Sequence, residues 1–417
     1  MTTDRRTLLK GLGATAALTL PHPVSAQSRG RVVVVGGGFG GATAARFLAR
    51  IGHDVTLVER DPAYVTCPFS NAVIGGFYSM PEITFDYAAL EAEGVRLVTG
   101  AATEVGDGAV TLDSGEVLPF DRLLLSPGVE MRFDALPGYT EAAAQKMPHA
   151  WKAGPQTALL QAQLADMEDG GLVVIAPPAN PYRCPPGPYE RASLIAHYLS
   201  ARKPASKILI LDAKEAFSKQ PLFEEAWSTL YPGMIDWIPP SMGGRVAEVD
   251  PTTMTVVTDF DRYEAAVANI IPPQQAATIA RAAGVTDETG WCPVSGVTFE
   301  SDLVAGIHVI GDACFAGVMP KSAFSANAQA KVAAVAIDAL LRGEAPNSPK
   351  LLNTCYSLAA PDYAFTVAGV YGEADGKLFE VEGAGGLSPL GAPAAVRSAE
   401  AEYARSWYAT ITTEAFA

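Results

Sequence analysis

The chain has 417 residues and a formal net charge of −15. This length is sufficient for two or three domains. The acidic balance argues against a nucleic acid partner, because phosphate binding requires basic stripes, and it favours solubility or docking to a basic partner. No stretch beyond the N-terminal region is apolar enough to predict a transmembrane helix.

The first 26 residues have the pattern of a twin-arginine export signal. The pair Arg5-Arg6 precedes a short apolar stretch from Gly11 to Leu20, and Val24 to Ala26 offer small residues for cleavage. The apolar stretch is too short to span a bilayer, which requires ~20 residues. A disordered basic tail is the alternative. We expect export of a folded, cofactor-loaded protein to the periplasm.

A glycine fingerprint at the start of the mature chain predicts a dinucleotide-binding unit. The stretch Arg31 to Val35 indicates a buried parallel strand, which leads directly into Gly36, Gly38, Phe39 and Gly41. The first glycine makes the tight turn, the second allows close approach of a pyrophosphate, and the third packs helix on strand. The helix that follows would direct its amino end at the phosphates.

A second strand supports this interpretation. Val55 to Val58 precede Glu59, which lies 18 residues after Gly41 and is expected to bind a ribose hydroxyl. A glycine-rich turn in an ordinary α/β domain is the alternative. Because strand, helix, second strand and acid occur in the required order, we predict dinucleotide binding.

Two later segments are predicted to return the chain to the same cofactor. Asp121 to Gly128 form a strand that closes on a glycine turn, and Ile307 to Ile310 lead into Gly311 and Asp312. In FAD proteins of this architecture, such an aspartate hydrogen-bonds the ribityl chain. The cofactor predicted for the first domain is therefore FAD.

A proline-rich loop stands where the second α/β unit would carry its own nucleotide fingerprint. Six prolines occur between residues 177 and 188. Proline lacks the amide hydrogen that a phosphate cradle needs, so we expect a disabled NAD(P)H site. The predicted fold is α/β, a disulfide-reductase-like flavoprotein with two Rossmann-type domains. The predicted parts are an FAD-binding domain at 29–150 and 265–345, a second domain at 151–264, and an irregular C-terminal interface domain at 346–417.

The mature chain contains five cysteines: Cys67, Cys184, Cys292, Cys314 and Cys355. In an oxidising compartment they are disulfide candidates, and their odd number leaves at least one with another task. Cys292 and Cys314 could form a structural disulfide or remain free buried thiols. The five histidines show no metal-binding spacing, so no metal is predicted.

Around three of these cysteines the chain resembles the flavoprotein subunit of flavocytochrome c sulfide dehydrogenase. The resemblance extends over essentially the whole mature chain and is most specific at Tyr64–Gly76, Cys184–Glu190, Gly290–Val294, Gly311–Cys314 and Asn353–Ser357. It implies a thioether from Cys67 to the flavin 8α-methyl group, a redox disulfide between Cys184 and Cys355, and Glu190 as a base. It also implies a c-type cytochrome partner. Because this chain has no Cys-x-x-Cys-His motif, any haem would be on another polypeptide.

The implied chemistry is sulfide oxidation. An exposed or strained disulfide is an electrophile for hydrosulfide, and its opening would leave one cysteine as a persulfide and the other as a thiolate. Glu190 lies six residues after Cys184 and could accept the proton of hydrogen sulfide or of a thiol. A flavin would link this two-electron step to a one-electron cytochrome.

Each assigned role has an alternative that the sequence leaves open. A Cys184–Cys355 bond could be purely structural, worth ~4 kcal/mol on the loop-entropy model. Cys67 could be a free thiol, and Glu190 could serve the dipole of a helix. Lys321 could lie near the flavin pyrimidine and stabilise its reduced form, or it could be a surface lysine. Competing functions are sulfide:quinone oxidoreduction, which would call for a C-terminal amphipathic membrane anchor, and a non-catalytic flavoprotein relay subunit.

Overall fold

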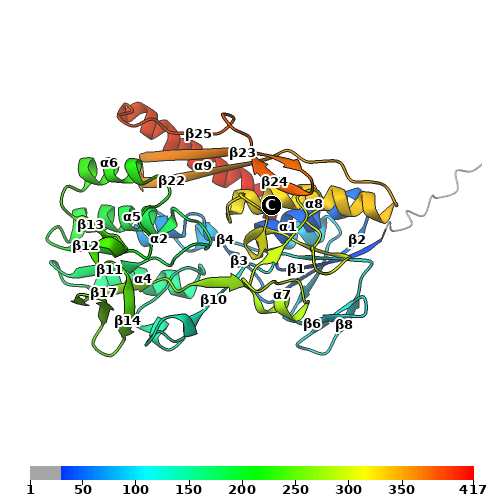
Figure 1. Cartoon of the computed structure of the whole chain (residues 1–417), viewed down its shortest axis with the longest axis horizontal. Coiled ribbons are helices and arrows are strands. Elements are labelled where there is room, and N and C mark those ends of the chain that lie inside the picture. Colours follow the sequence, from blue (N-terminus) through cyan, green and yellow to red (C-terminus); the bar gives the residue numbers. More distant parts are fainter. Residues whose placement is uncertain (1–29) are drawn as a thin grey trace, which may run out of the picture.

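A computed structural model of the chain describes residues 30–417, so the predicted export signal lies outside the described residues. Two parallel β-sheets form the centres of two α/β units. Figure 1 shows the first unit on the right, the second on the left, and the C-terminal segment along the upper side of both. None of the helices within 30–417 combines the length and apolarity needed to cross a bilayer.

The first sheet has the strand order β20-β9-β1-β2-β5, and every neighbouring pair is parallel. Its strands are β1 (Arg31–Val35), β2 (Asp54–Glu59), β5 (Arg96–Thr99), β9 (Arg122–Leu125) and β20 (Ile307–Val309). All four valines of β1 are buried, as expected for a central strand covered on both faces. The position of β20 beside β9 shows that the chain returns to this sheet after it has formed the second unit.

The helices of the first unit are α1 (Phe39–Ile51), α3 (Ala88–Ala92), α7 (Thr278–Ala282) and α8 (Ala323–Leu341). Helices α1 and α8 pack against each other. The sequence predicts a helix over 84–93, but Thr84 and Phe85 form β4, which pairs with β3 (Tyr64–Val65). Both residues of β4 are β-branched or aromatic, which favours a strand over a helix.

The second sheet has the order β13-β12-β11-β17 and is also parallel. Its strands are β11 (Leu172–Ala176), β12 (Lys207–Leu211), β13 (Ile235–Ile238) and β17 (Val267–Ile270), and the nearby helices are α2 (Ser70–Ile74), α4 (Pro155–Asp166), α5 (Gly187–Arg202) and α6 (Gln220–Leu230). Strand β17 thus belongs to this sheet although it lies beyond residue 264. The two parallel sheets with their helices confirm the predicted fold class.

Shorter strands complete the two units. The antiparallel meanders are β6 (Ala102–Gly106), β7 (Ala109–Leu112) and β8 (Val117–Pro119), and β14 (Val246–Asp250), β15 (Thr255–Thr258) and β16 (Arg262–Glu264). The remaining pairs are β10 (Val129–Met131) with β18 (Gln274–Ala276), and β19 (Cys292–Pro293) with β21 (Cys314–Phe315). The hairpin turn predicted at 113–115 joins β7 and β8, as expected.

The C-terminal segment is regular, which contradicts the expectation of an irregular module. It forms an antiparallel sheet from β22 (Leu351–Ala360), β23 (Tyr363–Ala374), β24 (Lys377–Glu380) and β25 (Gly386–Leu387), followed by the helix α9 (Ala394–Phe416). Its clustered glycines and prolines lie mainly between β24 and α9, so they do not interrupt the two long strands or the helix.

The end of α9 packs on the first unit. The Phe416 ring lies 5.4 Å from the Phe39 ring and 5.5 Å from the Tyr64 ring, measured between centroids. The buried Arg46 side chain of α1 donates to the carbonyl oxygens of Thr413 and Glu414, at 3.0 and 2.6 Å. The C-terminal helix therefore covers the fingerprint region with its own apolar side chains.

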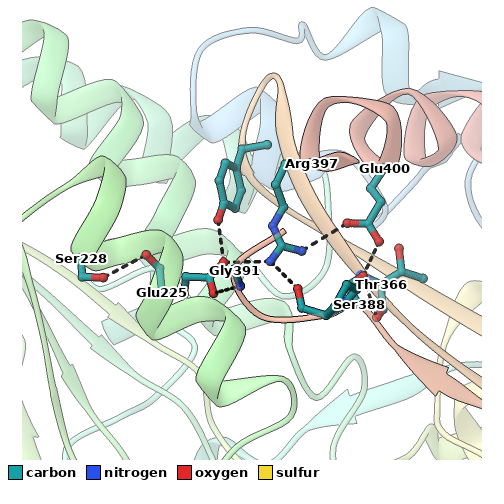
Figure 2. A network of polar contacts seen from close by, with 9 residues as sticks. Glu225, Ser228, Thr366, Ser388, Gly391, Arg397 and Glu400 are labelled. Carbon is teal, nitrogen blue, oxygen red and sulfur yellow. Dashed lines mark hydrogen bonds and ion pairs between the residues drawn. The ribbon is translucent and has the colours of Figure 1, made fainter. Parts of the chain in front are cut away.

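The start of α9 is attached to the second unit by a buried arginine (Figure 2). Arg397 has a side-chain exposure of 1% and lies 2.8 Å from the Glu225 carboxylate of α6. Its other nitrogen lies 3.4 Å from Glu400, and the backbone amide of Gly391 donates to Glu225 at 2.6 Å. The Arg397 side chain thus links α6 to the loop that precedes α9 and to α9 itself.

Replacing Arg397 by methionine is expected to lower the free energy of unfolding by about 3 kcal/mol, because Glu225 would lose its buried counter-ion. Denaturant unfolding followed by circular dichroism measures the loss. Arg405→Met on the same helix is the control, since the Glu402 partner of Arg405 is 69% exposed and such a pair contributes ~0–1 kcal/mol. Equal losses in the two variants would contradict this account.

Candidate functional site

A cavity of about 910 Å³ lies where the first unit, the second unit and the C-terminal segment meet. Its walls come from the turn between β1 and α1, the loop after β2, the first turns of α5, strand β22 and helix α9. A cavity of this size and position is typical of a cofactor site between domains.

The glycine fingerprint forms one end of this cavity. Gly36 has a φ of +97°, and a Cβ there would lie 2.3 Å from the carbonyl oxygen of Ser126. A Cβ on Gly41 would lie 1.8 Å from the carbonyl oxygen of Gly36, so this glycine is required by the close packing of helix on strand. Gly38 caps α1 and lines the cavity, and Phe39 begins the helix. The amino end of α1 is therefore open to a phosphate-bearing ligand.

Four further predicted cofactor residues occupy the walls or the rim. Glu59 ends β2 and lines the cavity, with its carboxylate 2.6 Å from the amide of Gly37. Gly128 lines it with a φ of +68°, and Gly311 lines it with a φ of +73°. Asp312 also lines it, and its Oδ1 is buried without a hydrogen-bond partner among the described residues. A buried carboxylate oxygen without a partner beside a glycine-lined cradle fits a hydroxyl-rich dinucleotide such as FAD.

Lys321 is not among the residues that line the cavity, although the next residue, Ser322, is. Its ammonium donates to the carbonyl oxygen of Cys314 at 2.6 Å and lies 3.8 Å from the centre of the Trp291 ring. Burial lowers the pKa of this lysine. Because its own carbonyl oxygen accepts from the amide of Cys184 at 2.9 Å, Lys321 supports the cysteine loop. The position of this side chain relative to a flavin stays a prediction.

Cys67, Cys184 and Cys355 all line the same cavity, and all are free thiols in this structure. Cys184 has a φ of +56°, a left-handed conformation held by the hydrogen bonds on either side of the loop. Burial raises the pKa of the Cys184 thiol, and the nearby Cys355 and Glu190 raise it further. The fold thus brings Cys184 and Cys355 together from positions 171 residues apart. Their disulfide stays a prediction.

Glu190 lies beside these cysteines in the first turn of α5. One carboxylate oxygen accepts from the side-chain amide of Asn71 at 2.8 Å, and the other accepts from the backbone amide of Leu358 at 2.9 Å. Burial raises the pKa of Glu190, although these hydrogen bonds lower it in part. Since its partners come from α2 and β22 rather than from its own helix, a role limited to the helix dipole does not account for it.

Cys292 and Cys314 form a separate pair outside the cavity. They are directly opposite each other in the parallel ladder of β19 and β21, and both are buried free thiols. The Sγ of Cys314 donates to the carbonyl oxygen of Gly311 at 3.2 Å. Burial raises the pKa of each thiol to about 12, which makes both poor nucleophiles.

Three basic side chains beside the cysteines were not predicted from the sequence. Arg183 lies 3.5 Å from Asp312 and lines the cavity. Arg191 is 2% exposed and donates to the side chains of Asn71 and Asn269. The ammonium of Lys219 lies 3.7 Å from the Sγ of Cys355. Arg183 could have been found from its position next to Cys184, but nothing in the sequence connects Lys219 with Cys355.

The corresponding nucleotide position of the second unit is occupied by the chain itself. Asp212 follows β12, where a Rossmann unit places its ribose-binding acid. Here the carboxylate accepts from the hydroxyl of Tyr189, from the indole nitrogen of Trp237 and from the ammonium of Lys214. This network engages the acid at that position within the chain, and the disabled NAD(P)H site stays a prediction. Within residues 30–417, no cluster of three or more His, Cys, Asp or Glu side chains could hold a metal ion.

Three family models match consecutive parts of the chain. The model of the pyridine nucleotide-disulphide oxidoreductases matches residues 30–165. The central model of the sulfide dehydrogenase [flavocytochrome c] flavoprotein chain matches 157–272, and the flavin-binding model of flavocytochrome c sulphide dehydrogenase matches 347–416. The flavin-binding model and the fold support FAD as the cofactor.

One curated relative and two solved structures are similar to this chain. A sequence of the sulfide dehydrogenase [flavocytochrome c] flavoprotein chain from Chlorobaculum thiosulfatiphilum is 64% identical over 45 residues, which are 10% of this chain and 94% of that sequence. The sulfide:quinone oxidoreductase of Aquifex aeolicus has a similar fold, with a TM-score of 0.68 and 17% identity over 92% of each chain. An NAD-dependent persulfide reductase from A. fulgidus has a TM-score of 0.60 and 14% identity, over 90% of this chain and 77% of that one.

Proposed function

We propose that this chain, which belongs to the flavocytochrome c sulfide dehydrogenase flavoprotein-like family, oxidises sulfide at Cys184 and Cys355 and delivers the electrons to a separate c-type cytochrome. One observation carries the proposal. Two distant cysteines, a buried glutamate and a dinucleotide cradle converge on a single cavity.

The residues that would hold FAD are those of the cradle. The amino end of α1 would face the pyrophosphate, Glu59 the ribose and Asp312 the ribityl chain. Cys67 faces the same cavity and is the residue we propose for a thioether to the flavin. When bound, the flavin supplies the conversion of a two-electron oxidation into single-electron transfers.

The cysteine pair would perform the first bond change. Hydrosulfide attacks one sulfur of the Cys184–Cys355 disulfide, the sulfur–sulfur bond breaks, and one cysteine becomes a persulfide while the other leaves as a thiolate. When the substrate arrives as hydrogen sulfide, its proton passes to Glu190, whose carboxylate lies beside Cys184. The raised pKa of Glu190 brings this carboxylate closer to a useful base at neutral pH.

The C-terminal helix favours a protein acceptor over a membrane quinone. Its apolar side chains Tyr408, Ile411 and Phe416 are buried against the chain itself. The hydroxyl groups of Tyr408 and Thr66 are hydrogen-bonded at 2.7 Å, so Tyr408 is a packing residue. Trp407 instead lines the cavity and stacks on Phe324, which makes it the better candidate for contact with the cytochrome. A periplasmic location after twin-arginine export belongs to the same proposal.

The test compares electron donors and acceptors on the purified flavoprotein under anaerobic conditions. We expect sulfide to bleach the flavin on the time scale that a stopped-flow experiment resolves, and NADH to leave it oxidised. Added cytochrome c should then be reduced faster than a soluble quinone. A protein that dithionite bleaches but sulfide does not would fit the relay subunit instead, and preferential quinone reduction would favour sulfide:quinone oxidoreduction.

Replacing Glu190 by glutamine is expected to slow bleaching by sulfide about 10²-fold at neutral pH, the lower end for loss of a general base. In the wild type the rate should fall as the pH drops through the raised pKa of Glu190, since only the carboxylate accepts a proton. In the variant the rate should instead follow the fraction of hydrosulfide at every pH, because no carboxylate remains to take the proton of hydrogen sulfide. The deficit should shrink at high pH, where hydrosulfide dominates. Stopped-flow bleaching over a range of pH measures both effects, and identical pH profiles would exclude Glu190 as the base.

A further inference from the structure

We propose that Lys219 is a positioning residue that stabilises negative charge on the sulfur of Cys355 and so makes Cys355 the leaving group when the disulfide opens. This inference rests on the proposed function. It assigns different roles to the two cysteines, with Cys184 as the site that hydrosulfide attacks and the carrier of the persulfide.

The contacts of Lys219 are all directed at the segment around Cys355. Its ammonium donates to the carbonyl oxygen of Cys355 at 2.9 Å and to the hydroxyl of Ser357 at 2.6 Å. The same nitrogen lies 3.7 Å from the Sγ of Cys355. These three contacts hold the cation beside one sulfur of the pair.

The charge of Lys219 has no carboxylate partner within ion-pair distance among the described residues. The residue is 6% exposed, and a buried ammonium without a counter-ion is costly. The Glu190 carboxylate acts on this ammonium from beyond ion-pair distance, whereas negative charge that develops on the sulfur of Cys355 would be in direct contact with it. Lys214, which is buried in the same unit, differs because its ammonium is paired with Asp212.

The backbone fixes this arrangement before any substrate binds. Lys219 is the N-cap of α6 and has a φ of +63°, a left-handed conformation that a lysine rarely adopts. Its carbonyl oxygen accepts from the amides of Leu222 and Phe223 at 3.0 and 3.2 Å. The first turn of α6 therefore anchors the residue, and its side chain extends to β22.

Direct contact with the Lys219 ammonium distinguishes Cys355 from Cys184, and this difference gives the reaction a direction. Lys219 lies 3.7 Å from the Sγ of Cys355, whereas it acts on Cys184 only at longer range, together with Arg183 and the Glu190 carboxylate. In the opening step, HS⁻ forms a bond to the Sγ of Cys184 and the electron pair of the broken sulfur–sulfur bond stays on the Sγ of Cys355. The sulfide sulfur is oxidised and the sulfur of Cys355 is reduced. A cation next to the departing sulfur stabilises the negative charge that develops there.

The test measures the reactivity of Cys355 without any need for sulfide. In flavin-loaded protein with Cys184→Ser, iodoacetamide at pH 7 should alkylate Cys355, and peptide mass spectrometry gives the rate. Adding Lys219→Met should slow this alkylation about tenfold, the order expected when a thiolate loses a neighbouring cation. Lys219→Arg should keep most of the rate. Lys214→Met should leave the alkylation rate unchanged, because the ammonium of Lys214 is paired with Asp212 and not with the segment around Cys355.

Lys219→Gln serves as a second variant, because it keeps a donor for Ser357 without the charge, and flavin absorbance confirms that each variant is folded.

In the wild type, a single equivalent of sulfide should place the persulfide on Cys184. The proposal would be overturned if the Cys184→Ser protein were alkylated at the same rate with Lys219 intact, with Lys219→Met and with Lys219→Gln. A persulfide found mainly on Cys355 would also overturn it. If the alkylation result holds while sulfide fails to bleach the wild-type flavin, the proposed function falls and the pairing of Lys219 with Cys355 stands.

Discussion

Replacing either Cys184 or Cys355 by serine is expected to give a folded, yellow protein that dithionite bleaches and sulfide does not. Each substitution removes one sulfur of the electrophilic pair, so hydrosulfide has no bond to open. The cradle at the amino end of α1 is formed by other residues, and it should still bind the flavin. Anaerobic stopped-flow absorbance of both variants, with sulfide and then with dithionite, measures the effect.

Cys292→Ser is the matched control for this experiment. Cys292 is a fully buried thiol outside the cavity, and burial raises its pKa to about 12. Its loss should leave the rate of sulfide bleaching close to that of the wild type. If the Cys184 and Cys355 variants also keep the wild-type rate, the pair has only a structural role and the site of sulfide attack lies elsewhere.

Replacing Cys67 by alanine is expected to release the flavin from a protein that otherwise retains it through acid precipitation. Cys67 lines the same cavity as Cys184 and Cys355 and lies in the segment between β3 and α2. If its sulfur forms the thioether, precipitated wild-type protein should be yellow and the supernatant colourless. In the variant the colour should move to the supernatant, and the mass of the peptide that contains residue 67 should lack the flavin.

The Cys314→Ser variant controls for a general loss of flavin affinity, since Cys314 lies beside the cradle residue Gly311 without lining the cavity. Its flavin should stay with the precipitated protein. Flavin in the supernatant of the wild type would contradict a covalent link through Cys67 and would leave the cradle as the sole means of holding the cofactor.

The order of elements in the two α/β units was predictable from local pattern. The buried valines of β1, the glycines after them and the acid at the end of β2 occur within thirty residues of one another, and α8 spans the predicted residues 323–341. Such segments are readable because helix and strand periodicity and turn chemistry are local properties of a sequence. The fold class follows from their order, as the two parallel sheets confirm.

Local pattern failed where long-range packing decides the conformation. The C-terminal residues form long strands and a helix because α9 packs on α1 and binds Glu225 through Arg397. Helix α5 begins at Gly187, inside the run of prolines that the sequence predicts as a loop. Proline is tolerated in a first helical turn, where its missing amide hydrogen has no intrahelical partner to lose.

The residue types of the candidate site were also evident from the sequence, since Cys184 and Glu190 stand close together in it and the family resemblance indicated Cys355. The sequence alone, however, could not place Lys219 against Cys355, Asn71 against Glu190, or the carbonyl group of Lys321 against the amide of Cys184. Each of these contacts joins segments that are more than a hundred residues apart or belong to different elements. Their charges act on one another only after folding has removed the water between them, so the electrostatics of the site are a property of the tertiary structure.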